Sequence, residues 1–113
     1  MISMDTVRQI ALAFPETDEH PHFHLRAFRV RKKIFATIDE KLKRLMVKLT
    51  LVDQSVFCAY DHSVIYPVPG GWGLKGSTYI ELDKIKKDML KDALTTAYCT
   101  TAPPKLAKAY LTK

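Results

Sequence analysis

Two segments near the middle of the chain, Ile34–Asp39 and Leu45–Thr50, carry apolar side chains at every second position. This period of two is typical of a β-sheet that has one covered face. A third segment, His24–Val30, has a strand-like composition, and only short basic turns separate the three. We therefore predict an antiparallel meander, with Ile34 and Ile38 on the face that helices cover.

The flanking segments predict those helices. Apolar residues between Val7 and Phe14 follow a helical spacing, and Pro15 should end this first helix. Ser3 or Asp5 can cap its start. Similar signals predict helices at Leu51–Tyr60, Asp83–Tyr98 and Lys105–Leu111, strands at Val64–Tyr66 and Ser77–Leu82, and a proline- and glycine-rich loop at 67–76.

The expected fold class is α+β. Residues 1–113 should form a single domain, in which N- and C-terminal helices pack on one face of an antiparallel sheet. A core between the sheet and the helices follows from the apolar pattern. It should include Phe35, Val47, Ile80, Leu90 and Leu94.

Composition limits the class of protein. Of the 113 residues, 47% are hydrophobic and 27% are charged, which suffices for a packed core and excludes a disordered tail. No apolar run approaches the ~18 residues that cross a bilayer, and the first residues lack a secretory pattern, so we expect a cytoplasmic protein. Cys58 and Cys99 have no CxxC partner and should fill the core as free thiols.

Positive charge is concentrated in the predicted meander. The chain has a net charge of +6, but nine basic and only two acidic residues lie between Arg26 and Lys48. Such an excess produces a positive field that attracts polyanions such as nucleic acid. The alternative is a solvated, lysine-rich strand edge that prevents aggregation.

The search for catalytic or metal-binding residues finds only weak candidates. His20, His22 and His24 alternate, so an extended backbone would place three imidazoles on one face, either as metal ligands or as a partly exposed strand edge. The acids in Glu16–Glu19 could hold a divalent ion, but such acids more often solvate a loop. The chain has no nucleophile or phosphate-loop motif. We therefore predict no enzymatic activity, no cofactor and no metal.

Five segments, in this order, extend over nearly the whole chain: FPETDEHPHF at Phe14–Phe23, RVRKKIFATI at Arg29–Ile38, LMVKLT at Leu45–Thr50, TYIEL at Thr78–Leu82 and AYCTTAPPKLAKAYL at Ala97–Leu111. Together they resemble the MmcQ/YjbR family. The resemblance implies a fold similar to that of the frataxin homologue CyaY and a proposed double-wing role in DNA binding. By position it matches the family's hairpin to Val30, Lys33 and Phe35, its following strand to Val47 and Lys48, and its loop tryptophan to Trp72. Iron handling, as in frataxins, would need an acidic ridge, whereas this sheet is basic.

The predicted hairpin tips and the tryptophan loop supply the candidate nucleic-acid contacts. Lysine and arginine at such tips reach phosphates, and an aromatic side chain in a loop stacks on a base or, alternatively, caps the core. The candidates are Arg29, Arg31, Lys32, Lys33, Lys41, Lys43, Arg44, Lys48, Trp72 and Lys75. We predict largely non-specific binding of duplex DNA without a membrane partner. The alternative is a small-ligand or protein-interaction module, and a small-ligand module should show a lined apolar pocket.

Overall fold

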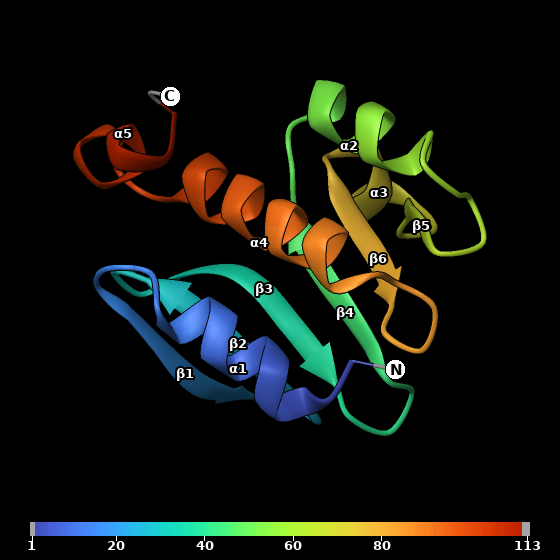
Figure 1. The fold of residues 1–113 in the computed structure, drawn as a ribbon, viewed down its shortest axis with the longest axis horizontal. Helices are drawn as coiled ribbons and strands as arrows, with labels where there is room; N and C mark the ends of the chain where they lie inside the picture. The colour runs from blue at the N-terminus through green and yellow to red at the C-terminus, as the bar shows by residue number, and fades with distance from the viewer. Residues whose placement is uncertain (1, 112–113) are drawn as a thin grey trace.

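The computed structural model describes residues 2–111 as one six-stranded antiparallel sheet with its two longest helices on one face (Figure 1). The strands are β1 (Thr17–His22), β2 (Leu25–Val30), β3 (Lys33–Asp39), β4 (Arg44–Lys48), β5 (Ile65–Pro67) and β6 (Ser77–Glu81), in the spatial order β1-β2-β3-β4-β6-β5. The helices are α1 (Met4–Leu12), α2 (Leu51–Cys58), α3 (Gly71–Leu74), α4 (Lys87–Thr101) and α5 (Pro104–Leu111). The predicted α+β fold class is confirmed.

Helices α1 and α4 lie side by side across the sheet and bury one of its faces (Figure 1). The alternation of the strands explains this, because apolar residues that are opposite each other in neighbouring strands point the same way. Leu45 on β4, for example, is paired with Ile38 on β3 and with Ile80 on β6, and all three are fully buried. The five predicted core residues are also fully buried: Phe35, Val47, Ile80, Leu90 and Leu94.

A β-bulge between β2 and β3 changes which side chains reach this core. Phe28 is opposite Ala36, but the next pair is Arg29 and Ile34, so Phe35 is the extra residue on β3. Phe35 is fully buried, whereas Ile34 lies on the opposite face of the sheet. Strict alternation predicted Ile34 on the covered face. That prediction is wrong because the bulge reverses the alternation.

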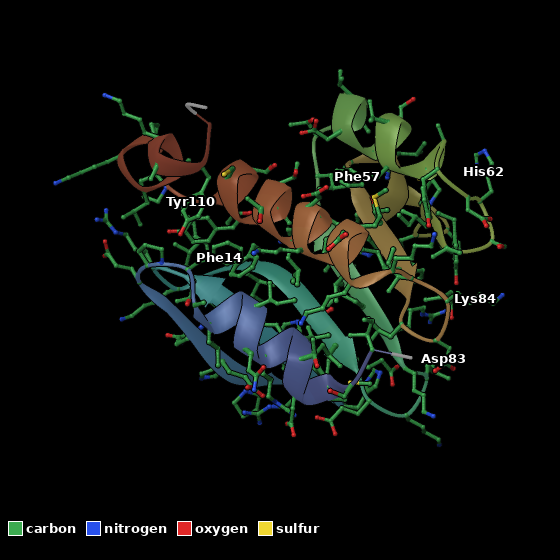
Figure 2. All side chains as sticks on the ribbon, viewed as in Figure 1. Phe14, Phe57, His62, Asp83, Lys84 and Tyr110 are labelled. Carbon is green, nitrogen blue, oxygen red and sulfur yellow. The ribbon has the colours of Figure 1, made fainter. Side chains whose placement is uncertain are left out.

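An aromatic cluster joins the two ends of the chain to the sheet. The Phe14 ring stacks on Tyr98 of α4 at a centroid distance of 4.6 Å, and Phe35 of β3 meets Tyr98 edge-on at 5.7 Å. Tyr110 of α5 contacts Phe14 edge-on at 5.4 Å (Figure 2). The Tyr98 hydroxyl donates to the carbonyl oxygen of Pro15 at 2.9 Å. This one tyrosine therefore holds α4 against the segment that follows α1.

The main element that the sequence analysis missed is β1. The acids of residues 16–19 were expected in a loop, yet Asp18 and Glu19 lie in this edge strand and pair with Arg29 and Phe28 of β2. The strand has no apolar alternation to reveal it, because all its side chains except that of Pro21 are polar and none is buried. Backbone hydrogen bonds and ion pairs with β2 hold this strand in place.

One further boundary and one loop differ from the predictions. Helix α4 begins at Lys87 rather than Asp83, because the chain first turns after β6, where the amide of Ile85 donates to the carbonyl oxygen of Glu81. The predicted three-stranded meander corresponds to β2, β3 and β4; beyond it, β6 pairs with β4, and β5 forms the outer edge. The predicted loop 67–76 contains the short helix α3.

Both cysteines are free thiols. Cys58 is part of the buried core and Cys99 packs against it, as expected of core filler. Burial raises the pKa of each thiol, which keeps both protonated at neutral pH. In residues 2–111, no helix combines the length and the apolar character needed to cross a membrane.

Replacing Leu94 by Ala should lower the free energy of unfolding by about 2–5 kcal/mol, because the packed helix and sheet cannot close the resulting cavity. Urea denaturation measures this change. The matched control is Lys91→Ala, an exposed position earlier on the same helix, which should change the free energy by less than about 0.5 kcal/mol. Equal effects of the two substitutions would contradict the described packing.

Candidate nucleic-acid interface

The face of the sheet opposite α1 and α4 carries partly exposed side chains, and we call it the open face. Its central row runs in register from Thr37 through Met46 and Tyr79 to Tyr66, across strands β3, β4, β6 and β5. Three of these four side chains are half-exposed, whereas on β3, β4 and β6 the neighbours of this row along the strand are buried. Large amphipathic side chains on a half-exposed face are typical of a binding surface.

A pocket of about 410 Å³ lies on the open face. Its lining is mostly apolar and comes from segments far apart in the sequence, including Leu25, Ile34, Met46, Trp72, Tyr79 and Lys48. Its volume falls within the usual range for small-molecule sites. Of these six residues, only Lys48 and Trp72 were predicted as site residues. The others escaped because the sheet register, and not local sequence, brings them together.

Helix α3 and the loop around it hold Trp72 at the rim of this pocket. Buried Gln54 of α2 donates from its side-chain nitrogen to the carbonyl oxygen of Gly73 at 3.0 Å and to that of Ser77 at 3.2 Å. A side chain at Gly73 would collide with the Val68 carbonyl, so only glycine permits this close approach. The loop is therefore firmly seated. Gln54 could have been noticed in the sequence as a polar residue one turn before buried Cys58.

Trp72 itself is 69% exposed, so it does not cap the core. The Lys75 ammonium lies 5.9 Å from the centre of its ring. A cation at this distance is attracted to the electron-rich face of an indole. The structure thus brings two predicted site residues, Trp72 and Lys75, together beside a third, Lys48, in the pocket wall.

The acidic segment before β2 neutralises part of the predicted basic region. Glu16 accepts hydrogen bonds from Arg31 at 2.8 and 3.1 Å, and Asp18 accepts from Arg29 at 2.7 and 3.0 Å. Hydrogen bonds from Arg31 lower the pKa of Glu16, and those from Arg29 lower the pKa of Asp18. The guanidiniums of the predicted residues Arg29 and Arg31 are therefore already occupied by carboxylates.

Glu19 makes a similar contact on the helical side. It accepts from Arg26 at 2.8 Å and from Arg8 of α1 at 3.1 Å. Burial opposes ionisation of Glu19, but the bonds from Arg26 and Arg8 outweigh it and lower the pKa of this carboxyl. The three acids and their arginines lie at nearly mirror-related positions about the turn at Phe23 and His24. This symmetry is the sequence signal that could have revealed the hairpin.

The remaining basic candidates occupy separate parts of the sheet. Lys32 lies in the two-residue turn between β2 and β3, and Lys33 is opposite the buried Val30, on the helical side. Lys41 and Lys43 lie in the turn between β3 and β4. The two turns are at opposite ends of β3, so the two predicted basic tips are not adjacent.

Arg44 lies on the open face and is locked in place. Its guanidinium carbon is 3.9 Å from the centre of the Tyr79 ring. Partial burial disfavours its charge, but a hydrogen bond with Tyr66 and nearby negative groups raise its pKa. Tyr66 in turn donates to Glu81. Arg44 is thereby held as a flat cation over one face of Tyr79.

The three histidines do not converge. Phe23, with φ of 58°, and His24 form the turn between β1 and β2, so His24 lies outside the extended strand. Its Nε2 atom is 3.6 Å from Oδ2 of Asp39. The prediction that His20, His22 and His24 share one face of an extended segment is therefore wrong. Within residues 2–111, no three His, Cys, Asp or Glu side chains are placed to hold a metal ion.

Comparisons with known proteins relate this chain to one protein family. A family model described as YjbR matches residues 12–100, a stretch that includes the whole open face. The crystal structure of Deinococcus radiodurans protein DR2400, whose family-model domain is DUF419, is similar with a TM-score of 0.77 and 20% identity, covering 88% of this chain and 78% of that one. At this identity the likeness concerns the fold. The search of curated proteins finds no match.

Replacing Glu19 by Gln should reduce the acid sensitivity of the fold. The carboxyl has an ordinary pKa of 4.5 and a lowered one when folded, so its stabilisation is present above pH 4.5 and is lost as pH falls through the folded pKa. The variant should lose on the order of 1–2 kcal/mol at pH 7 and show a flatter decline between neutral and acidic pH. Urea denaturation at several pH values measures both effects.

The control for this series is Asp92→Asn, an exposed carboxyl on α4. It should leave both the stability at pH 7 and the pH profile close to those of the wild type. A Glu19→Gln variant with the wild-type pH profile would show that the contacts with Arg26 and Arg8 contribute no net stabilisation.

Proposed function

Because the chain belongs to the YjbR family and presents lysines around an aromatic pocket on an open sheet face, we propose that it binds nucleic acid there. The observation that carries the proposal is the position of exposed lysines at both ends of β3 and along the face. Lys32 lies at one end and Lys41 at the other, while Lys48 and Lys75 flank the pocket. The family resemblance adds the expectation of a DNA-binding role.

The spacing of these lysines suits a phosphate backbone. The seven residues of β3 span roughly 20 Å, so Lys32 and Lys41 can reach phosphates on both sides of a groove about 12 Å wide. Each neutralised phosphate releases condensed counterions, which supplies binding free energy without reading the bases. Binding should therefore depend strongly on salt.

The ion pairs of β1 argue for weak sequence preference. Arginine reads guanine with two parallel hydrogen bonds from a free guanidinium. Here Arg29, Arg31 and Arg26 already donate to carboxylates of residues 16–19. The exposed lysines act instead as point charges on phosphates. We propose largely non-specific contacts for this reason.

The pocket supports a second candidate function, a small-ligand module without catalytic activity. Its 410 Å³ and its mostly apolar lining fit a small molecule whose anionic group reaches Lys48. This candidate predicts binding that does not need Lys32 or Lys41. Variants at those two positions therefore separate the two functions.

A variant with Lys32, Lys41 and Lys48 changed to Ala should bind duplex DNA more weakly and flatten the salt dependence. The slope of the logarithm of the binding constant against the logarithm of the salt concentration should decrease in magnitude by about 2–3 units. Each lost phosphate contact lowers the magnitude of this slope by about 0.9. Fluorescence anisotropy with a labelled duplex at several salt concentrations measures the slope. All three side chains are exposed, so the fold should persist.

The matched control removes the same charge from α4 and the turn before it. Lys84, Lys87 and Lys91 are exposed, and changing them to Ala should alter the slope by less than about 1 unit. Two observations would count against nucleic-acid binding at this face. One is wild-type protein that binds no duplex or single strand even at low salt, and the other is an equal loss of slope in both triple variants.

A further inference from the structure

We infer that the pocket of the open face holds an unpaired nucleobase, and that the protein therefore prefers single-stranded nucleic acid to duplex. This inference rests on the proposed function and adds the form of nucleic acid that the site recognises. It begins from Trp72, a large aromatic side chain that is left 69% exposed at the pocket rim. An indole in such a position offers a flat face on which a base can stack.

Contacts of the surrounding loop fix the backbone that carries Trp72 before any ligand arrives. Gln54 fixes the loop through the carbonyl oxygens of Gly73 and Ser77, and Gly76 packs directly on the Leu49 carbonyl. A preformed platform loses little conformational freedom on binding. Local hydrogen bonds thus hold an apolar ring out in solvent, where its burial by a ligand would be favourable.

The rest of the pocket has the shape and polarity of a base site. Arg44 covers one face of Tyr79, so that ring forms a wall and leaves Trp72 as the stacking partner. Met46 and Ile34 add an apolar surface, and Thr37 supplies a hydroxyl that can hydrogen-bond to the edge of a base. With about 410 Å³, the pocket has room for a base and its sugar.

Two cations complete the complementarity to a nucleotide strand. Lys48 lies in the pocket wall, and the Lys75 ammonium is 5.9 Å from the Trp72 ring centre. A strand whose base enters the pocket would bring its flanking phosphates near these lysines. Aromatic stacking combined with lysines along a backbone is the arrangement that single-strand binding surfaces share.

Duplex DNA cannot use this pocket in the same way. Its bases are paired and stacked inside the helix, and extruding one costs a few kcal/mol. A duplex is therefore limited to the phosphate contacts of the open face, whereas a single strand gains the stacking contact in addition. The preference for single strands should come from Trp72, and the salt dependence from the lysines.

The test uses Trp72 as its own probe, since it is the only tryptophan in the chain. Titration with a labelled oligothymidylate should quench tryptophan fluorescence and show tighter binding by anisotropy than the matched duplex. Trp72→Ala should weaken single-strand binding by about 5-fold to 150-fold, the range for losing one stacked base, and leave duplex binding within about 2-fold of the wild type. Trp72→Phe should restore part of the affinity.

Leu74→Ala is the matched control, because this residue is also in α3 and is even more exposed. It should leave both affinities unchanged. Equal binding of single strand and duplex, or a Trp72→Ala variant that loses both equally, overturns the base pocket while nucleic-acid binding stands. Binding of neither form by the wild type overturns both proposals.

Discussion

The burial of only one face of the sheet governs the rest of this structure. Helices α1 and α4 supply apolar side chains to a single face, and the strands pack their branched residues against them. The other face must then carry residues that tolerate both water and contact, and here it carries Tyr79, Tyr66, Met46 and Arg44. Arg44 over Tyr79 shields part of that surface. The composition of the open face is thus a consequence of how the core is closed.

Local periodicity was sufficient to predict most of the fold. Ser3, one of the two predicted caps of α1, accepts a hydrogen bond from the amide three residues later, and Thr50 caps α2 in the same way. The covered strands and the long helix were found because their apolar residues repeat with a period set by the backbone. β1 carries no such pattern, since its acids Asp18 and Glu19 bind arginines of β2 instead of packing in the core. The position of Ile34 depended on a bulge, which only the pairing of two strands defines.

The candidate site was predicted less completely, for a related reason. Exposed lysines such as Lys32 and Lys48 could be identified from composition and turn positions, because a charge is a property of one residue. Whether a charge is balanced depends on what lies across the hairpin, and Arg29 and Arg31 turned out to face acids that precede the basic segment. Residues of five strands and of the segment around Trp72 line the pocket, so no single stretch of sequence predicts it.

The composition of the two edge strands has a consequence for assembly. β1 and β5 lie at the outer edges of the sheet, and each contains a proline, Pro21 and Pro67. Proline has no backbone N–H to donate to an added strand, so each edge lacks one donor of a hydrogen-bonded ladder. Each edge is therefore a poorer template for continuing the sheet with a second copy of the chain. The hydrogen-bonded ladder ends within one molecule, so high protein concentration should not favour fibre growth by strand addition.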